Sequence, residues 1–305
     1  MDNANNKTND RFLKIDFSQL MDLRVDYAFK LIFGTGDTLF LISLLNAIFA
    51  NKKIPRIIKS LTVVNPYLEK YSQEDRLSIL DIRAQLDDGT TILIEMHLYD
   101  LYDLKYKTIR SWARAYGEEL KTNKAYATQP PVICVTFTNG SLDEIESQKI
   151  HKCCKITDID DHIIFSDALE LHYIDMKAFV KTINKTGSIG KCQTEETMLA
   201  NWLAIITEKG IKDKTIIKNI CEEQEAIGMA VSALVRLSED KITRQAYQKR
   251  QDEIMLHNKR MSHMEQEIKN KDTIIADKDV IIANKDIENE QLRLQLELLR
   301  SQLGK

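Results

Sequence analysis

Between Ile79 and Asp100 the chain alternates apolar and polar residues on either side of a short polar segment. This pattern predicts two strands joined by a turn, since side chains of a strand point alternately to its two faces. The odd-numbered positions are mostly polar and include Asp81 and Glu95. The even-numbered positions are all apolar, and we expect them to face the core: Leu80, Ile82, Ala84, Leu86, Ile92, Ile94, Met96 and Leu98.

The length of the turn decides how the two carboxylates meet. A three-residue loop, Asp87-Asp88-Gly89 with the glycine in the left-handed region, places Asp81 opposite Glu95. A four-residue loop keeps both on one face but one step out of line. A two-residue turn sends the apolar positions of the two strands to opposite faces, and the pattern rejects it.

Other segments give a helix-rich α/β order. Helical spacing or composition marks residues 17–33, 36–49, 104–124, 176–183, 195–210 and 221–237, and apolar runs predict strands in 57–65, 131–137 and 162–176. The run "PVICVTF" has the composition of a strand buried on both faces. In the helix after the hairpin, the stripe predicted to face the core comprises Ile109, Ala113, Tyr116 and Leu120. The expected fold class is α/β, with a helix, three strands, a helix and a further strand.

From about residue 240 the sequence follows a heptad pattern in place of the mixed helix and strand patterns before it. One heptad position is apolar but for Asn289, and it comprises Ile254, Met261, Ile268, Ile275, Ile282, Leu296 and Leu303. The position three residues later is apolar at the ends and lysine in the middle: Met264, Lys271, Lys278, Lys285, Leu292 and Leu299. This pattern predicts a coiled coil and a homo-oligomer, with a long solvated helix as the alternative.

Composition narrows the class of protein. The chain has 305 residues, a hydrophobic fraction of 43% and a net charge of -3, so its overall charge does not indicate nucleic-acid or membrane binding. No apolar run reaches the roughly 18 residues of a membrane span, and the N-terminus has no secretory pattern. The five cysteines lack CxxC spacing, and the pair Cys153-Cys154 beside His151 has no second ligand pair. We expect reduced thiols in a cytoplasmic protein.

Two opposed carboxylates destabilise a sheet unless something neutralises them. Arg83 lies on the same face and offers an ion pair, in which case the polar face is simply solvated. Alternatively a divalent cation lies between Asp81 and Glu95, since oxygen ligands suit Mg²⁺ or Mn²⁺. The pattern alone leaves both interpretations open.

Several spaced motifs resemble one bacterial family. The segments "DYAFKLIFG", "LISLLNAIF", "LSILDIRAQLDDGTTILIEMH" and "LELHYIDMKAF" recur in that order in the PD-(D/E)XK nuclease family transposases, over about residues 20 to 240. The resemblance implies a restriction-endonuclease-like core, with Asp81 of the second strand and Glu95 of the third as catalytic residues that ligate Mg²⁺ (or Mn²⁺). It also implies hydrolysis of DNA phosphodiester bonds, linked to recombination or mobile elements.

One position departs from that family. The superfamily usually has lysine two residues after the glutamate and this family typically glutamine, whereas the run here is "IEMH" with His97. A histidine can orient or deprotonate water, and we take His97 as the third catalytic candidate. The alternative is a catalytically decayed nuclease fold that acts as an oligomeric coiled-coil DNA-binding or interaction module.

Two further groups extend the expected site. The resemblance makes Asp26 a candidate metal ligand beside Asp81 and Glu95, against the alternative of a local ion pair with Lys30. Lys107, Arg110 and Arg114 share one flank of the helix after the hairpin and are candidates for binding DNA phosphates. Arg110 is the strongest of the three, because arginine is common at that place in the family.

The expected domain organisation has four parts. Residues 1–16 form a disordered N-terminus, 17–180 the nuclease-like domain, 181–240 a helical extension and 241–305 the coiled coil.

The heptad pattern leads to the first prediction. The full chain is expected to form oligomers and a chain ending at residue 240 to be a monomer, as measured by size-exclusion chromatography with light scattering. Equal numbers of subunits in the two proteins would contradict an interface built by the C-terminal heptads.

Overall fold

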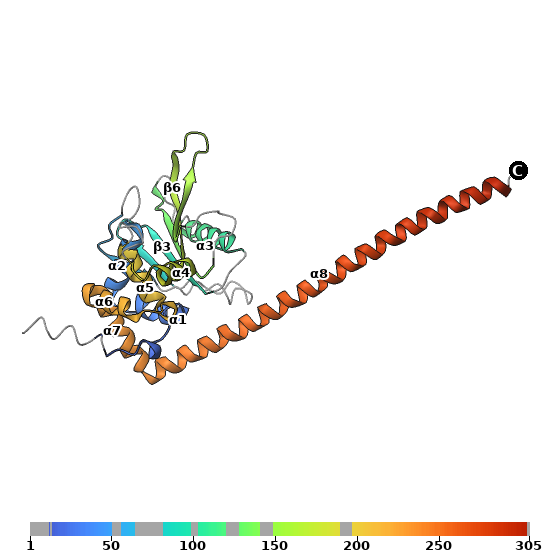
Figure 1. Ribbon diagram of the computed structural model, residues 1–305. Coiled ribbons are helices and arrows are strands. Elements are labelled where there is room, and N and C mark those ends of the chain that lie inside the picture. Colours follow the sequence, from blue (N-terminus) through green and yellow to red (C-terminus); the bar gives the residue numbers. More distant parts are fainter. Residues whose placement is uncertain are drawn as a thin grey trace, which may run out of the picture. The chain divides into compact units, whose positions relative to one another are not determined.

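The computed structural model describes residues 12, 14–50, 56–64, 82–98, 103–119, 128–140, 149–189 and 197–303. These residues belong to two units, one ending at Tyr247 and the other beginning at Gln248. Helices and a mixed sheet make up the first unit, and a single long helix makes up the second (Figure 1).

The strands that the structure describes form one six-stranded sheet in the order β1-β2-β3-β4-β6-β5. Their bounds are Leu61–Val64 (β1), Ile82–Leu86 (β2), Thr91–His97 (β3), Val132–Thr138 (β4), His151–Thr157 (β5) and Ile164–Asp175 (β6). The central strands β3, β4 and β6 are parallel, whereas β1, β2 and β5 pair antiparallel with their neighbours. Helix α3 (Leu104–Glu119) supplies the crossover that a parallel β3-β4 pair requires. The predicted order of helix, three strands, helix and strand is present.

The predicted hairpin has the expected register. Ile82 pairs with Ile94 and Arg83 with Leu93, which corresponds to a three-residue loop of Asp87, Asp88 and Gly89. Gly89 has a φ of 83°, a conformation that glycine adopts without the penalty of a Cβ. The three-residue turn is confirmed and the four-residue alternative is wrong. A loop with an even number of residues would turn the apolar residues of the two strands to opposite faces, so it would not have kept both carboxylates on one face. Asp81 lies outside the described residues.

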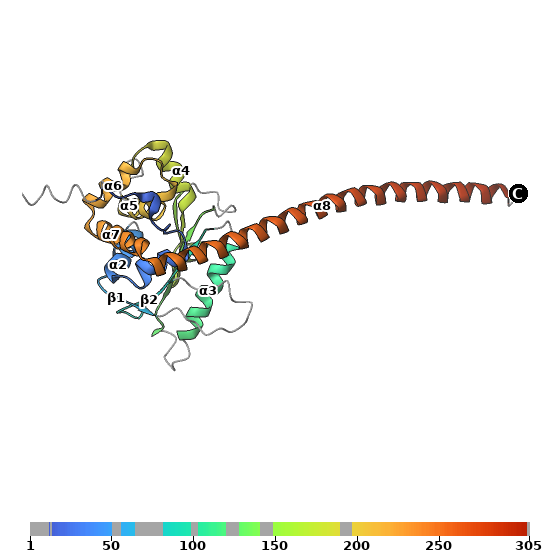
Figure 2. The same ribbon diagram turned by 90° about the horizontal axis from the view of Figure 1, so that it is seen from below.

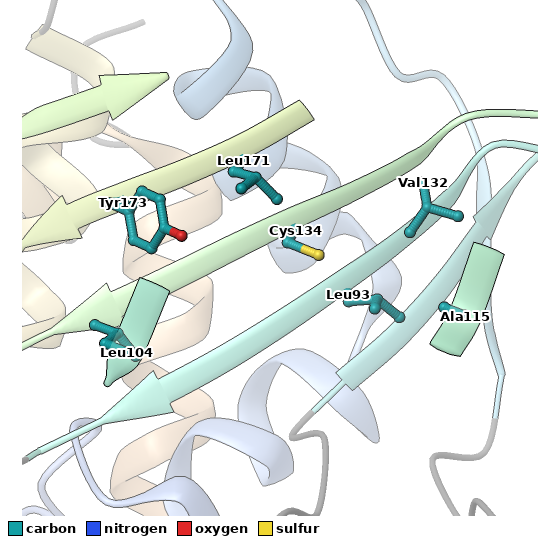
Figure 3. Packing of buried hydrophobic residues seen from close by; sticks show 7 residues of the cluster. All are labelled: Leu93, Leu104, Ala115, Val132, Cys134, Leu171 and Tyr173. Carbon is teal, nitrogen blue, oxygen red and sulfur yellow. The ribbon is translucent and has the colours of Figure 1, made fainter. Parts of the chain in front are cut away.

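Helix α3 covers the odd-numbered face of β3. Leu104 and Ala115 of this helix pack on Leu93 and on the next strands of the sheet (Figure 3). The strand residues of this cluster besides Leu93 are Val132, Cys134, Leu171 and Tyr173. The interpretation in which this face is simply solvated is therefore wrong over β3, because a helix separates it from water.

The opposite face is covered by the first helices: α1 (Asp26–Phe29), a π-helical turn η2 (Lys30–Gly34) and α2 (Thr38–Phe49). Phe29 lies 5.6 Å from Phe137 of β4, measured between ring centroids, and Phe49 lies 5.1 Å from the ring of His172. Asp37 caps α2 by accepting a hydrogen bond from the backbone of Leu39. Figure 2 shows α3 separated from the other helices of this unit by the sheet.

The remaining helices of the first unit follow the sheet along the chain. Their bounds are η1 (Phe17–Gln19), α4 (Met176–Thr186), α5 (Thr197–Ile206), η8 (Glu208–Gly210), α6 (Lys214–Glu223) and α7 (Glu225–Glu239). Asp175 caps α4 through the backbone of Ala178, so its role is structural.

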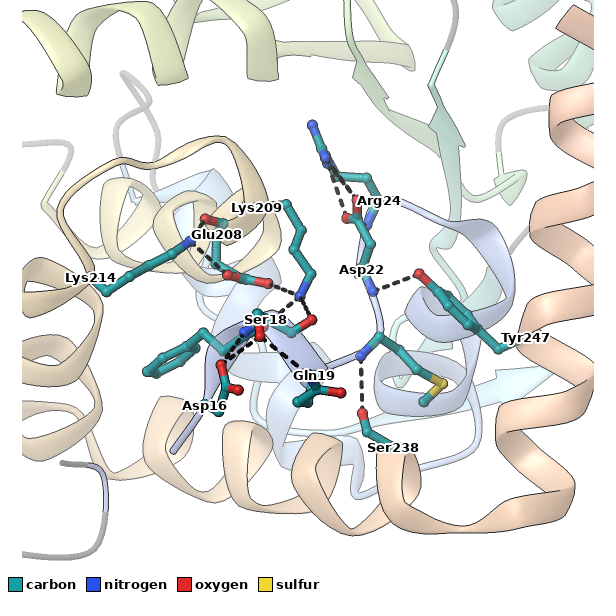
Figure 4. Close-up of polar contacts among 12 residues, drawn as sticks. Asp16, Ser18, Gln19, Asp22, Arg24, Glu208, Lys209, Lys214, Ser238 and Tyr247 are labelled. Atoms are coloured by element: carbon teal, nitrogen blue, oxygen red, sulfur yellow. Dashed lines mark hydrogen bonds and ion pairs between the residues drawn. The ribbon is translucent and has the colours of Figure 1, made fainter. Parts of the chain in front are cut away.

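Residues near the start of the chain are tied to α7 and to the start of α8 (Lys241–Leu303). The backbone of Met21 donates to Ser238, and that of Asp22 donates to Tyr247 (Figure 4). Glu208 is buried and neutralised by Lys209 and Lys214 at 3.0 and 2.9 Å. The hydrogen bonds of Met21 and Asp22 to Ser238 and Tyr247 explain why the first unit extends as far as Tyr247.

The buried stripe of α3 differs from the predicted one. Ile109 is 44% exposed and Ala113 is also exposed, so the predicted stripe is wrong at these two positions. Tyr116 does pack against the core cluster, and Leu120 lies outside the described residues. The residues of α3 that face the sheet are Leu104, Thr108, Ser111, Trp112 and Ala115. Two of these five are hydroxyl residues, which is why an apolar pattern did not reveal the face.

Strand β5 was not predicted, because "HKCCKIT" carries two lysines and no apolar alternation. Helix α8 is present as a single helix of 63 residues. Its apolar heptad residues from Met261 to Leu299 are exposed in the single chain, and the coiled coil stays a prediction.

Across the described residues, no individual helix combines the length and apolar character needed to cross a bilayer. The bent pair Asp26–Gly34 and Thr38–Phe49, at 104° to each other, meets the criterion only when both are taken together.

Burial along α2 gives the second prediction. Leu41 is fully buried and Leu39 on the same helix is 57% exposed. Leu41→Ala is expected to lower the free energy of unfolding by about 2–5 kcal/mol, because it leaves a cavity in the core. Leu39→Ala is the control and is expected to change it by about 0.5 kcal/mol or less. Urea denaturation measures both, and equal losses would contradict the burial of this face.

Candidate active site around Glu95

Glu95 lies near the carboxyl end of β3 and points toward α3. It is only 6% exposed, because the helix closes over its strand. Ser111 of α3 donates a hydrogen bond to Oε1 of Glu95 at 2.9 Å. Nε2 of His97 lies 2.9 Å from Oε2. The carboxylate is thus held at both oxygens by partners from two different elements.

These partners keep Glu95 charged. Burial alone would raise the pKa of Glu95, since it removes the charged form from water. The hydrogen bond and charge of His97, the charge of Lys107 and the hydrogen bond of Ser111 outweigh this effect and lower the pKa below its usual value. Because an ionised carboxylate only accepts hydrogen bonds, Nε2 of His97 carries the hydrogen of their contact. A buried, ionised carboxylate beside an imidazole is an arrangement suited to binding a cation or moving a proton.

Two further ionisable groups near Glu95 stay uncharged. Burial together with the Glu95 charge raises the pKa of the Cys134 thiol. Burial likewise raises the pKa of Tyr173 to about 12, although a hydrogen bond with Thr108 opposes this shift. Both groups are therefore neutral at physiological pH, and they add no charge to the site.

The structure places the other predicted site residues as follows. Asp26 is the first residue of α1, where its carboxylate accepts a hydrogen bond from the backbone of Tyr27. Among the described residues, Asp26, Glu95 and His97 do not form a group whose ligand atoms lie within 4.8 Å of one another. Asp81 lies outside the described residues, so its meeting with Glu95 stays a prediction.

The three basic candidates of α3 lie in different settings. Lys107 is half-buried and close enough to Glu95 to lower the pKa of that carboxylate. Arg110 is exposed. Arg114 forms an ion pair with Glu118 one turn later, with 3.6 Å between Nε and Oε1.

Arg83 takes part in the same ion-pair group. Its guanidinium lies 3.0 Å from Oε2 of Glu118, and its side chain is largely buried. Glu118 therefore binds two arginines, one from β2 and one from α3, and joins the helix to the strand beside β3. An ion pair of Arg83 with the carboxylates was one of the two interpretations left open by the sequence, and the structure gives Arg83 this contact with Glu118.

A second polar group was missed by the sequence reading. Cys153 of β5 lies beside Glu170 and His172 of β6, on the other face of the sheet from Glu95. The sequence showed "HKCCK" but gave no sign of its partners, because the pairing of β5 with β6 brings them together. His172 thus contacts Cys153 of the neighbouring strand and Glu170 of its own strand.

The fold and the buried glutamate define a class before any comparison is made. A mixed sheet with an acidic residue near the end of its third strand, covered by a crossover helix, is consistent with a PD-(D/E)XK nuclease-like fold. The family model for PD-(D/E)XK nuclease family transposase matches residues 23–263, and the chain belongs to that family. No curated protein and no solved structure matches the chain. The membership indicates a nuclease- or transposase-related role.

The hydrogen bond from Ser111 leads to the third prediction. Ser111→Ala is expected to destabilise the protein by about 1.5–3 kcal/mol at neutral pH, because the bond is made to a buried charge. The pKa of Glu95 is lowered in the folded protein, so its ionised form stabilises the fold fully above the ordinary carboxyl pKa of about 4.3. That contribution is lost as pH falls through the folded pKa.

The difference between wild type and Ser111→Ala is therefore expected to shrink in acid, as measured by urea denaturation from pH 7 to pH 3. Ser232→Ala is the control, since Ser232 is a buried serine that donates to the carbonyl of Gly228. Its effect is expected to be independent of pH. A pH-independent effect of Ser111→Ala as well would contradict an ionised Glu95.

Proposed function

We propose that this protein is a Mg²⁺-dependent DNA endonuclease that acts in recombination or in the movement of mobile elements. The observation that carries the proposal is the buried carboxylate of Glu95, held in its ionised form by His97, Ser111 and Lys107. Family membership supplies the reaction class. Residues 82 to 85 of β2 pair with β3 in the register that a three-residue loop produces. The same register continued by one residue would place Asp81 opposite Glu95, which supports Asp81 as the second carboxylate.

The residues present suit a hard divalent cation. Each oxygen of Glu95 accepts one hydrogen bond, from His97 or from Ser111, which leaves lone pairs for a metal because a carboxylate has about four acceptor sites. Carboxylate oxygens are preferred by Mg²⁺ and Mn²⁺. Glu95 and Asp81 would hold the ion, with Asp26 as a further candidate ligand. A bound Mg²⁺ would activate water and stabilise negative charge on the phosphate.

The protein groups have separate parts in this proposal. Ser111 orients Glu95 from α3, so the carboxylate is fixed before substrate arrives. His97 holds a proton at Nε2 against Glu95 and is placed to exchange it with water at the carboxyl end of β3. Lys107 brings a positive charge to the same place, where a phosphate would lie.

DNA is the proposed partner, and α3 is its proposed contact. Lys107, Arg110 and Arg114 lie on one helix whose other side covers the sheet. The pairing of Arg114 with Glu118 reduces the charge it offers, so Arg110 and Lys107 are expected to contribute most. The exposed apolar heptads of α8 support a homo-oligomer. The chemistry requires neither a membrane nor a secreted location, and we propose a cytoplasmic protein.

The contact between His97 and Glu95 also favours the second candidate function. In a decayed site, an imidazole fixed on the metal-binding carboxylate would keep the ion out. The protein would then act as an oligomeric DNA-binding or interaction module without turnover.

The fourth prediction tests the nuclease. Purified full-length protein is expected to nick supercoiled plasmid DNA with Mg²⁺ or Mn²⁺ and to lose this activity with EDTA. Glu95→Gln and Asp81→Asn are each expected to lower the nicking rate at least 100-fold, because each removes a charge that binds the ion. Gel electrophoresis of plasmid forms measures the rate.

Asp87→Asn is the matched control, because it removes a carboxylate from the same hairpin at a position paired with Ser60. It is expected to cut like wild type. Cutting that survives both Glu95→Gln and Asp81→Asn would refute the proposal. No cutting by wild type, His97→Gln or His97→Lys with either metal, combined with retained DNA binding, would establish the non-catalytic function instead.

A further inference from the structure

The antiparallel pairing of β5 with β6 brings three different ligand types to one place. Cys153 lies directly opposite His172, and Lys155 lies opposite Glu170 two residues away. All four side chains share a face, because positions two apart along a strand point the same way. His172 is fully buried, Glu170 is 7% exposed and Cys153 is half-buried.

The ligand atoms of this group are already close to one another. Nε2 of His172 lies 2.8 Å from Oε1 of Glu170, and Sγ of Cys153 lies 3.8 Å from that oxygen and 4.0 Å from that nitrogen. Around a tetrahedral zinc ion the sulfur-to-nitrogen and nitrogen-to-oxygen separations are about 3.5 and 3.3 Å, as its bond lengths require. Shifts of about half an ångström would convert the observed geometry into a zinc site.

The outer partners suit a metal ligand as well. Nδ1 of His172 lies 2.9 Å from Nε2 of His151, which is also buried. Nε2 of His172 donates its hydrogen to the carboxylate of Glu170, and a zinc ion would replace that proton. Nδ1 of His172 would then donate to Nε2 of His151, in the way that metal-binding histidines usually donate their second ring N–H to an acceptor. Lys155 lies 3.0 Å from Oε2 of Glu170, so it contacts the oxygen that points away from the cysteine and histidine.

The group is separate from Glu95. The neighbouring residues Leu171, Tyr173 and Cys154 belong to the side of the sheet that packs against α3, as does Leu93. Cys153, Glu170 and His172 alternate with them and point to the opposite side, where Phe49 of α2 contacts the His172 ring. An ion at this place would not share ligands with the proposed nuclease site.

We propose that Cys153, Glu170 and His172 form a zinc site with three protein ligands and one position open to solvent. A thiolate, an imidazole and a carboxylate together favour a borderline-soft ion such as Zn²⁺ over Mg²⁺ or Ca²⁺. The half-buried thiol provides the route from solvent.

The site lies where the edge of the sheet becomes irregular. The register of β5 and β6 shifts directly after Lys155, so the regular pairing ends beside the proposed ligands. A zinc ion would join β5 to β6 at the last regular pairs and stabilise the edge strand. Its effect is therefore expected on stability, whether or not the protein cleaves DNA.

The fifth prediction uses Co²⁺ as a spectroscopic probe and Zn²⁺ as the ion. Full-length protein, stripped with a chelator and dialysed, is expected to bind one Zn²⁺ per chain and to melt at a higher temperature with it. Co²⁺ is expected to give the near-ultraviolet charge-transfer band of a bound thiolate. Cys153→Ser is expected to abolish this band, to lower zinc affinity at least tenfold and to remove the shift in melting temperature.

Cys154→Ser is a matched control, since the adjacent thiol points to the other face of the sheet. It is expected to keep the band, the affinity and the shift. Glu95→Gln is expected to keep them too, which separates this site from the nuclease site. Wild-type protein that gives no thiolate band with Co²⁺ would overturn the proposal, as would a band that Cys153→Ser retains or Cys154→Ser removes.

Discussion

The structure depends on how it accommodates a charged carboxylate inside its sheet. An isolated ionised carboxylate is costly to bury, yet Glu95 is almost fully enclosed between β3 and α3. Its charge is maintained by a serine from the helix, a histidine from its own strand and the charge of a nearby lysine. These contacts determine where α3 lies along the sheet, because Ser111 must reach Glu95 while Leu104 and Ala115 remain in the apolar cluster. The same contacts therefore set both the position of α3 and the geometry of the candidate site.

Local chemistry made much of the fold predictable. The hairpin and its apolar face followed from the alternation around Asp87, Asp88 and Gly89, and the structure selected the three-residue loop over the four-residue one. The strand in "PVICVTF" was recognisable because its residues are almost all apolar, and β4 is indeed buried throughout. In each case the residues that set the structure are neighbours in sequence. Family motifs added Glu95 and His97 as site residues.

Tertiary packing decided what the sequence left open. Helix α3 has apolar residues on two sides, and the buried side is the one that carries Thr108 and Ser111, since those hydroxyls meet polar groups of the sheet. The pairing of Cys153 with His172 joins residues of two strands, one of which has no strand-like pattern. Whether a polar residue is exposed or enclosed depends on the element that packs over it. That element is far away in the sequence, so a local pattern does not reveal it.

The three-residue turn at Gly89 also limits how this chain can evolve. Surface loops ordinarily accept insertions and deletions, because their length has little effect on the core. Here one added or lost residue would reverse the facing of every side chain that follows in β3, and Glu95 would exchange its place with an apolar neighbour. Substitutions that preserve length can accumulate in this turn, whereas a change of its length would disturb the core and the candidate site together.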